Sequence, residues 1–377
     1  MKIFWIYYKM DTIMVYPHPK TEKGISAYSI NLIESLKEQG LIIKEETFIS
    51  GKFFSLFKKI PNLLKYNIIH LQHEYNLLGL YGTPYFFLLN ILGKIFRKKI
   101  IITMHTVLSQ SQEFTGSKLK TFLRKLLYKK QNKCINKNSK LIIVHAQFFK
   151  DILVEEYNIP KEKIKVIPHG IIKNISQLDK EQAKKDLNLL GNVFLMIGGM
   201  IPDHGMDIVL KEADKIGKTI LVVSNPFSTT NDRNSKKRKN YVRLCEEIVK
   251  KNRFEKEVRF DFKKIPNDLW WKYFNASDLV LLPYKGGIGS GIFADAMAVR
   301  KPVVASNIKY FKEISNKYGC IKTVESTQPF SHTINKVMNP KNYEKMIKEC
   351  QRYFDENNLT VVAKKYMALY KEEENKK

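Results

Sequence analysis

The stretch from Asp278 to Ser306 constrains the fold of this chain more than any other. It begins with a continuous apolar run, Leu279 to Leu282, which is typical of a buried parallel strand. A glycine-rich loop follows, and Ser290 is placed to cap a helix that leads into a second apolar run after Pro302. The order strand, loop, helix, strand predicts one βαβ unit of a doubly wound α/β sheet.

The glycine-rich loop is suited to bind an anion. Glycines let the backbone approach a ligand closely, and the start of a helix offers free N–H groups and a favourable dipole. A phosphate would gain about 1 kcal/mol from the dipole alone. A tight turn that binds nothing explains the same residues equally well. The candidate phosphate-binding residues are Gly287, Gly289, Ser290 and Gly291.

The length of 377 residues is too great for one ordinary core, so we expect two domains. Strand and helix signals alternate in both halves, which predicts two Rossmann-like α/β domains facing a cleft. The expected domains are residues 1–172 and 173–355, followed by a C-terminal helix at 356–377 that packs back across the hinge and ends frayed. The expected strands are 3–8, 41–48, 68–72, 100–103, 141–144, 164–167, 193–197, 219–224, 258–260, 279–282, a run after 302, and 320–324.

Polar clusters follow the expected strands of the first half. They are the loop from His18 to Gly24, the triplet Gln72-His73-Glu74, and the pair His105-Thr106. Because the carboxyl ends of parallel strands meet at one edge of a sheet, these clusters predict a ligand site at that edge. A histidine bonded to backbone or a domain contact would explain the same residues, most readily for His73 and Glu74.

The net charge of +28 favours a negatively charged partner. Nucleic acid, anionic lipid and a phosphorylated substrate all fit, and no RRM, KH, helix-turn-helix or zinc pattern supports the first. The four cysteines lack C-x-x-C spacing, which favours reduced thiols over a disulfide or zinc site. No signal peptide is evident, and we expect a cytoplasmic protein. The longest apolar candidate, residues 77–96, is broken by glycine and proline and predicts a loop plus a buried helix.

A basic amphipathic helix is predicted from Ser117 to Lys130. Five apolar residues recur at helical spacing and form one face. The flanking basic residues are Lys118, Lys120, Arg124, Lys125 and Lys129. Such a helix can lie on an anionic membrane surface, or it can pack on its own domain with solvated lysines. A second charged run, residues 231–240, predicts a solvated loop.

Seven segments, taken in order, resemble the GT-B fold glycosyltransferases of family 4 (group 1). They are GISAYSINLIESL from Gly24, HLQHEYNLLG from His70, ITMHTV from Ile102, VIPHGI from Val166, IGGMIPDHGMDIVL from Ile197, ASDLVLLPY from Ala276, and SGIFADAMAVRKPVVAS from Ser290. The resemblance implies an acceptor-binding first half and a second half that binds a nucleotide-diphosphate sugar. It further implies transfer in the cleft, with retention of configuration, without a metal ion or other cofactor. The acceptor would be a glycan, a lipid-linked molecule or a small molecule.

The resemblance also assigns candidate site residues. His105 resembles the histidine that contacts the donor sugar, and Asp295 the second acidic residue, which binds the ribose. The N–H of Gly24 could form a second phosphate nest, and Lys285 lies close in sequence to the glycine-rich loop. The donor-binding candidates are Gly24, Gly199, His204, Lys285, Gly287, Gly289, Ser290 and Gly291. His73 and Glu74 are acceptor-side candidates.

The donor site departs from the family pattern at three positions. Met200 and His204 stand where members commonly have an Arg and a Lys, and Gly287 stands where they have the first acidic residue. A free imidazole at position 204 is only partly charged at neutral pH, and a donor diphosphate close to it would favour the charged form. The alternative is a loop histidine that points to water. The departures keep open a non-catalytic relative that binds sugar nucleotides, and the charge alone keeps open a nucleic-acid-binding protein.

Overall fold

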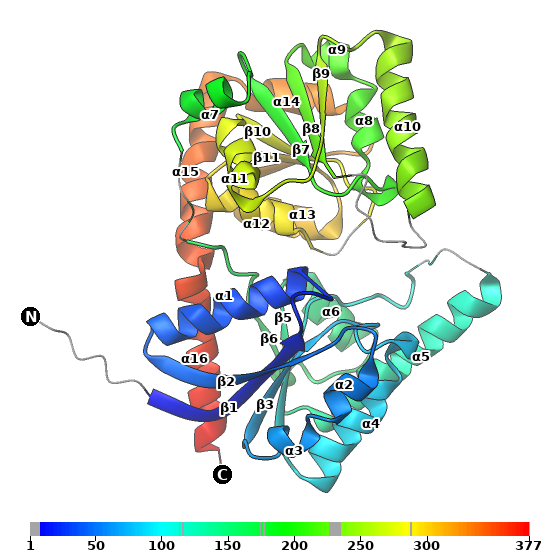
Figure 1. Cartoon of the computed structure of the whole chain (residues 1–377), viewed down its shortest axis with the longest axis vertical. Helices are drawn as coiled ribbons and strands as arrows, with labels where there is room; N and C mark the ends of the chain where they lie inside the picture. Colours follow the sequence, from blue (N-terminus) through cyan, green and yellow to red (C-terminus); the bar gives the residue numbers. More distant parts are fainter. Residues whose placement is uncertain are drawn as a thin grey trace, which may run out of the picture. The chain divides into compact units, whose positions relative to one another are not determined.

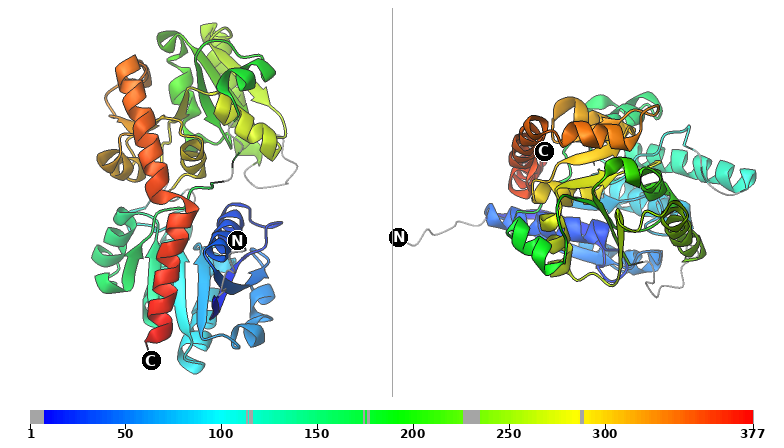
Figure 2. Two further views of the ribbon diagram at one scale, coloured as in Figure 1. Left: turned by 90° about the vertical axis from the view of Figure 1, so that its left-hand side faces the viewer. Right: turned by 90° about the horizontal axis from the view of Figure 1, so that it is seen from above.

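The computed structural model describes residues 8–112, 114, 117–173, 175, 178–225, 235–286 and 289–376. The chain forms two compact units (Figure 1). Unit 1 is Met1–Gly170 together with Asn357–Lys377, and unit 2 is Ile171–Glu356. Each unit has one parallel sheet with helices on both of its faces (Figures 1 and 2). This is the two-domain α/β architecture that the alternating signals predict.

The sheet of unit 1 has six parallel strands in the order β2-β1-β3-β4-β5-β6. The strands are β1 (Tyr8–Pro17), β2 (Leu41–Phe48), β3 (Ile68–His73), β4 (Lys99–Met104), β5 (Leu141–Val144) and β6 (Ile164–Val166). β3 and β5 are buried throughout. β5 is a continuous apolar run, as expected of a strand covered on both faces, whereas β3 also buries His70, Gln72 and His73. The strand order reverses between β1 and β3, so the loops after these two strands flank the switch point where α/β sheets bind ligands.

The C-terminal helix belongs to unit 1, where it lies along the sheet (Figure 2). The Tyr366 hydroxyl lies 3.0 Å from the Tyr28 hydroxyl and 3.2 Å from Thr103 Oγ1. The helical segments of this unit are α1 (Gly24–Glu38), α2 (Phe53–Phe57), α3 (Ile60–Leu63), η1 (Leu80–Gly82), α4 (Pro84–Asn90), η2 (Ile91–Ile95), α5 (Lys118–Asn138), α6 (Gln147–Glu155), η3 (Lys161–Lys163) and α16 (Leu359–Asn375).

The sheet of unit 2 has the order β12-β11-β10-β7-β8-β9. Counted from β7, this is the 3-2-1-4-5-6 order of dinucleotide-binding folds, with its switch point between β7 and β10. The strands are β7 (Val193–Ile197), β8 (Thr219–Ser224), β9 (Val258–Phe262), β10 (Leu279–Leu282), β11 (Val303–Ser306) and β12 (Ile321–Val324). The helical segments are α7 (Lys180–Asp186), η4 (Pro202–His204), α8 (Met206–Leu210), α9 (Ala213–Ile216), α10 (Ser235–Asn252), α11 (Asn267–Ala276), α12 (Gly291–Ala298), α13 (Lys309–Lys317), α14 (Phe330–Val337) and α15 (Pro340–Asn357).

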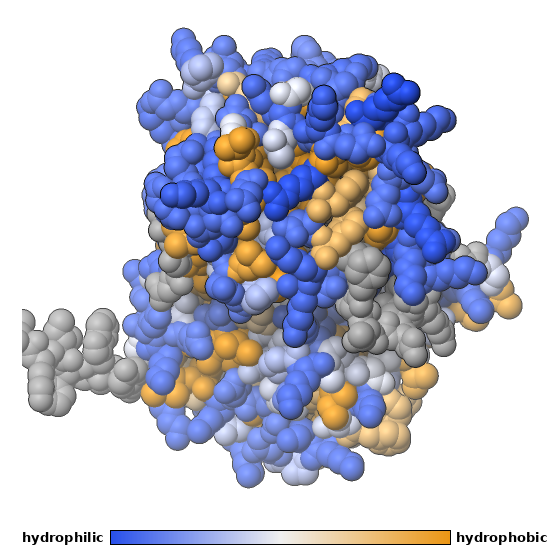
Figure 3. All heavy atoms as spheres, turned by 45° about the horizontal axis from the view of Figure 1, so that its top comes forward, coloured by the Kyte–Doolittle hydropathy of each residue, from blue (hydrophilic) through white to orange (hydrophobic). Residues whose placement is uncertain are grey.

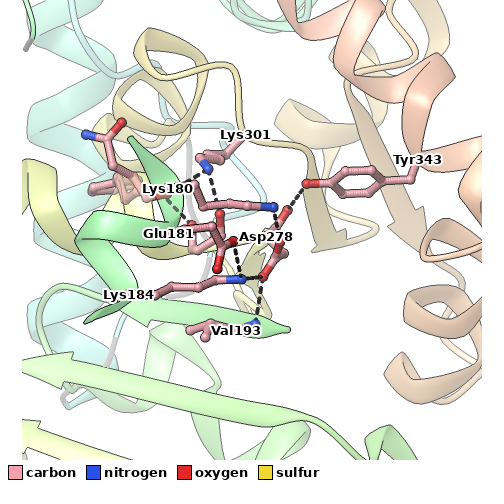
Figure 4. A network of polar contacts seen from close by, with 10 residues as sticks. Lys180, Glu181, Lys184, Val193, Asp278, Lys301 and Tyr343 are labelled. Carbon is pink, nitrogen blue, oxygen red and sulfur yellow. Dashed lines mark hydrogen bonds and ion pairs between the residues drawn. The ribbon is translucent and has the colours of Figure 1, made fainter. Parts of the chain in front are cut away.

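A buried ionic network holds the start of β10 (Figure 4). The Asp278 carboxylate lies 2.9 Å from Lys180 Nζ and 3.1 Å from Lys184 Nζ, and it accepts a hydrogen bond from Val193 N at 2.9 Å. The Tyr343 hydroxyl donates to the Asp278 carbonyl at 2.8 Å. These contacts tie α7, β7 and α15 to the amino end of β10, away from the glycine-rich loop. The network is therefore structural, since a buried carboxylate without partners would be strongly destabilising.

Two expectations about elements need correction. The predicted strand at 3–8 falls almost entirely outside the described residues, and the first described strand is Tyr8–Pro17, whose apolar side chains are buried from Met10 onward. The loop predicted at 231–240 is wrong from position 235, where α10 begins. The charged residues at 236–239 form the beginning of α10, a helix whose buried face includes Tyr241, Val242 and Cys245. A purely polar run can therefore open a helix when a buried apolar stripe follows it.

The apolar stretch at 77–96 forms η1, α4 and η2. One face of α4 is buried through Tyr85 and Leu88, as expected, but Phe87 is 66% exposed. Among the described residues, no helix is both long and apolar enough to cross a bilayer.

Candidate functional site

The loops after β7 and β10 contact each other at the switch point of unit 2. Lys285 N donates to the Asp203 carbonyl at 2.9 Å. Gly205 has φ +62°, and a Cβ at this position would lie 1.9 Å from the Pro283 carbonyl oxygen. Only glycine permits this approach. The two glycine-containing segments predicted from sequence are thus one structural site.

His204 joins the same two loops. Its Nδ1 donates to the Gly199 carbonyl at 2.6 Å, and its ring stacks on Tyr284 with centroids 4.7 Å apart and planes 14° apart. Burial lowers the pKa of His204 below its ordinary value, against smaller raising effects of the Gly199 bond and Asp203. The ring is therefore less charged at neutral pH than we expected, and it does not point to water as a solvated loop histidine would.

Lys285 is paired within unit 2. Its Nζ lies 2.8 and 3.0 Å from the two carboxylate oxygens of Asp207, which also accepts a hydrogen bond from the Tyr241 hydroxyl at 2.6 Å. Its charge is balanced by Asp207 and is not free to replace the family's arginine and lysine. Met200, at the arginine position, is buried in the apolar core.

The start of α12 is open. Ser290 caps the helix, since its Oγ accepts a hydrogen bond from Phe293 N at 3.1 Å, and the Tyr284 hydroxyl lies 3.3 Å from the same oxygen. A Cβ built at Gly289 or Gly291 would meet no heavy atom of the described residues within 4 Å. The helix start therefore has room for a ligand in front of it, where dipole and N–H groups favour an anion. Gly287 lies outside the described residues.

Asp295 lies one turn into α12, beside Trp270 of α11. The Trp270 indole Nε1 donates to Asp295 Oδ2 at 3.1 Å. Burial raises the pKa of Asp295 to about 7, and the indole hydrogen bond opposes this rise. The carboxyl thus changes charge near neutral pH, as groups at functional sites often do. Trp270 was not among the predicted site residues, because nothing in the sequence relates it to a residue 25 positions later.

In unit 1, His105 follows β4 and is held by Gln72 of β3. The His105 Nε2 lies 2.8 Å from Gln72 Oε1. Since an amide oxygen only accepts, the Nε2 carries the proton and the Nδ1 has a free lone pair. Gln72 Nε2 lies 3.4 Å from His70 Nε2, and the His70 Nδ1 contacts the Tyr370 hydroxyl at 2.5 Å. Tyr370 of α16 is thus linked to His105 through the buried side chains of His70 and Gln72.

Tyr28 and two further histidines surround His105. The ring centroid of His145 lies 5.0 Å from that of His105 and 5.5 Å from that of His169, and Tyr28 contacts all three rings. Burial first, and the neighbouring histidines second, hold the pKa of His105 well below its usual value. Burial also lowers the pKa of His145 to about 4. The cluster is therefore neutral at physiological pH, and within the described ranges no three His, Cys, Asp or Glu side chains are arranged to hold a metal ion.

Sequence analysis missed His145 although the signal was present. His145 directly follows β5, as His105 directly follows β4. The rule that polar residues after parallel strands gather at one edge would have found it.

Three other candidates of unit 1 lie in different surroundings. Gly24 begins α1, but its N–H donates to Glu22 Oε1 at 2.8 Å, and the next N–H, of Ile25, donates to Glu22 Oε2 at 2.7 Å. The phosphate nest predicted there is filled by the chain's own carboxylate. His73 is fully buried, with its Nε2 2.9 Å from Gln131 Nε2, so it is a core residue. Glu74 stays partly exposed, and burial raises its pKa.

The amphipathic helix α5 leaves its apolar face uncovered in its first half. The exposed fractions are 68% for Leu119, 64% for Phe122, 45% for Leu123 and 38% for Leu126. The helix contains eight Lys or Arg and no Asp or Glu. In Figure 3 its start, which projects at the right as in Figure 1, shows hydrophobic beside hydrophilic residues. The interpretation that this face packs on its own domain is therefore wrong for these four residues.

Two family models match consecutive parts of the chain. Residues 41–173 match Glycosyltransferase Family 4, and residues 178–353 match Glycosyl transferases group 1. Among curated proteins, no sequence matches.

Solved structures share the fold over nearly the whole chain. Anabaena Alr3699/HepE in complex with UDP has 15% identity and a TM-score of 0.72, covering 96% of this chain and 100% of that one. A glycosyltransferase from Rickettsia africae has 16% identity and a TM-score of 0.71, covering 98% and 100%. Sucrose-phosphate synthase from Thermosynechococcus elongatus has 15% identity and a TM-score of 0.71, covering 96% and 98%.

Proposed function

This chain belongs to the group 1 glycosyltransferases of the GT-B fold, and we propose that it transfers a sugar from a nucleotide-diphosphate sugar to an acceptor bound by unit 1. The observation that carries the proposal is the open start of α12 at the switch point of unit 2, where Gly289 and Gly291 leave free space. The Anabaena protein, which shares this fold, was solved with UDP. Uridine diphosphate sugars are therefore the first donors to test.

The chemistry needs charge stabilisation more than covalent machinery. Breaking the bond between sugar and phosphate leaves negative charge on the nucleotide and an oxocarbenium-like sugar. Backbone N–H groups at Gly289–Gly291 would stabilise the phosphates, as preorganised donors do in an oxyanion site. Asp295 would accept from the ribose hydroxyls through the oxygen that Trp270 does not occupy. His105, neutral with a free lone pair on Nδ1, would accept a hydrogen bond from a hydroxyl of the donor sugar.

Two finer features of the proposal rest on the family resemblance. They are retention of anomeric configuration and independence of a metal ion. With Lys285 paired to Asp207 and Met200 in the core, the α12 N–H groups would provide most of the stabilisation of the diphosphate in unit 2.

We also propose that α5 places the protein on an anionic membrane surface. Its exposed apolar residues and its eight basic residues without an acidic one match such a surface. Each basic residue near the surface adds about 1 kcal/mol. A peripheral cytoplasmic enzyme with a lipid-linked acceptor would fit this surface.

The donor site is tested at Gly291. Replacing Gly291 with Ala and then Val should weaken nucleotide-diphosphate binding in steps, with Val abolishing it, because each added carbon fills the free space in front of α12. Isothermal titration calorimetry measures the affinities. Gly286 lies in the same loop, and a Cβ there would likewise meet no atom of the described part of the chain within 4 Å. It provides the control, and Gly286→Val should bind within about threefold of the parent. Normal binding by Gly291→Val would place the phosphates elsewhere.

A further inference from the structure

A cavity in unit 1 extends the exposed face of α5 into the protein. Its volume is about 290 Å³, and it lies between α5, the loop after β4, and Tyr157. Its walls are largely apolar and aromatic, formed by Leu108, Phe114, Phe122, Leu126, Tyr128 and Tyr157. Walls of this kind favour a hydrocarbon ligand.

Two lysines line the same cavity. Lys125 and Lys129 lie one helical turn apart on α5, and none of the described residues that line the cavity is acidic. Two ammonium groups beside an apolar cavity favour a phosphate attached to a hydrocarbon chain. The Glu156 carboxylate is not part of the lining, and it accepts hydrogen bonds from Ser109 Oγ at 2.9 and 3.0 Å. A phosphate would match the two ammonium groups, whereas a neutral apolar ligand would leave them to solvent.

The cavity opens onto the exposed apolar face. Phe122 and Leu126 line the cavity and are also 64% and 38% exposed. A chain could therefore pass from a bilayer surface along α5 into the cavity over apolar side chains.

One wall of the cavity is formed by a residue that lies close to His105 in sequence and is held by hydrogen bonds. Leu108 follows His105 by three residues, and its backbone is held on both sides, since Leu108 N donates to the Tyr75 hydroxyl at 3.3 Å and the Tyr157 hydroxyl donates to the Leu108 carbonyl at 2.8 Å. The loop that leads away from the candidate sugar-contacting histidine is thus also the wall of the cavity.

We propose that this cavity binds part of the phosphate-bearing hydrocarbon chain of an amphiphilic acceptor. The proposal rests on the proposed function, because it names the class of acceptor. At about 30 Å³ per water-sized group the cavity holds on the order of ten such groups, so a longer chain would continue along α5. Lys125 and Lys129 bind the phosphate, and the aromatic walls bind the first part of the chain.

Alkyl phosphates test the proposal directly. Calorimetric titration with hexyl, octyl and decyl phosphate, below their micelle concentrations, should show affinity rising by up to roughly fourfold per added methylene until the cavity is filled. Decanol and inorganic phosphate, each lacking one half of the ligand, should bind at least tenfold more weakly than decyl phosphate. Equal binding of inorganic and decyl phosphate would reduce the site to a phosphate site and overturn the proposal.

Matched lysine pairs separate the cavity from general surface charge. Lys125→Gln with Lys129→Gln should lower decyl phosphate affinity at least tenfold, whereas Lys118→Gln with Lys120→Gln, on the same helix but outside the cavity lining, should leave it within about twofold. Both pairs remove two charges, so both should weaken binding to anionic vesicles similarly. Equal loss of decyl phosphate binding in both pairs would show that only surface charge is involved and would overturn the proposal.

A cavity-filling variant and a donor titration complete the test. Leu108→Trp should abolish the rise of alkyl phosphate affinity with chain length. Leu119→Ala, which alters an exposed apolar residue outside the cavity, should show the same rise as the parent. Nucleotide-sugar affinity is measured on the same variants without any lipid. Donor binding without alkyl phosphate binding overturns the cavity proposal alone, whereas alkyl phosphate binding without donor binding overturns the proposed function.

Discussion

At the residue scale, the candidate site is set by partners that hold the chemical groups. Trp270 holds one oxygen of Asp295, and Gln72 fixes the proton of His105 on Nε2. Burial disfavours the charged form of each group, so it raises the pKa of Asp295 to about 7 and lowers the pKa of His105 well below its usual value. Asp295 therefore titrates near pH 7, while His105 remains uncharged. Any dependence of donor affinity on pH near neutrality should therefore come from Asp295 and not from the histidines.

Donor affinity should rise with pH through the pKa of Asp295. The ionised carboxylate is the stronger acceptor for ribose hydroxyls, and its fraction grows roughly tenfold between pH 6 and 8 for a pKa of about 7. A nucleotide-diphosphate sugar should accordingly bind several-fold more tightly at pH 8 than at pH 6. A sugar-capped donor is the right ligand, because it lacks the second phosphate ionisation near pH 6.

Two variants check the origin of this pH dependence. Asp295→Asn should bind more weakly at pH 8, by about 1–3 kcal/mol, and with a flat pH profile. Trp270→Phe should shift the profile to higher pH, because the indole hydrogen bond lowers the pKa of the carboxyl. A parent profile that is flat, or one that Asp295→Asn reproduces, would remove Asp295 from the donor site.

At the element scale, the two halves of α5 have different surroundings. The second half is buried through Tyr128, Gln131 and Ile135, and it anchors the helix in unit 1. The first half keeps its apolar face exposed. An exposed apolar face on a helix whose charged residues are all basic is typical of a surface that docks on anionic lipid.

The protein should co-sediment with anionic vesicles and detach as salt rises, because screening weakens the attraction between lysines and headgroups. Changing Arg124, Lys125 and Lys129 to Glu should remove most of the binding. A matched triple change of Lys236, Lys239 and Lys250 to Glu, on α10 of unit 2, alters the net charge by the same amount. This variant should retain most of the vesicle binding. Equal losses in both triple variants would show that net charge alone, and not α5, governs binding.

Elements were predictable from sequence where burial fixes the pattern. The strands at 141–144, 193–197 and 279–282 are continuous apolar runs, and the strand at 219–224 has an apolar run between Thr219 and Ser224, because both faces of a parallel sheet are covered. The bounds of all four agree with the prediction. The start of α10 was not predictable, because its first residues are all polar and only the residues after 240 show a buried stripe.

The candidate site was predictable only in part, for a related reason. The glycine loop and its Ser290 cap follow from local sequence. The pairing of Lys285 with Asp207 and of Asp295 with Trp270 joins residues 78 and 25 positions apart, and such pairs depend on tertiary structure. Glu22 at the start of α1 is a local contact that its position two residues before Gly24 could have indicated.

At the scale of the whole molecule, the proposals give roles to some of the residues behind the net charge of +28. The basic residues of α5 serve a lipid surface, and two of them, Lys125 and Lys129, also bind the phosphate of the acceptor. Lys180 and Lys184 are instead paired with the buried Asp278. None of these roles requires nucleic acid. The central claim is that unit 2 binds a nucleotide-diphosphate sugar at the start of α12.

Thermal unfolding with a panel of nucleotide-diphosphate sugars tests that claim most directly. At a hundred times its dissociation constant, the correct donor should stabilise the protein by about 2.7 kcal/mol. Gly291→Val, which keeps the fold, should show no such gain at the same donor concentration. Duplex DNA should give no stabilisation that survives physiological salt. The account is contradicted if no sugar nucleotide stabilises the parent protein, or if the Gly291→Val variant is stabilised as much as the parent.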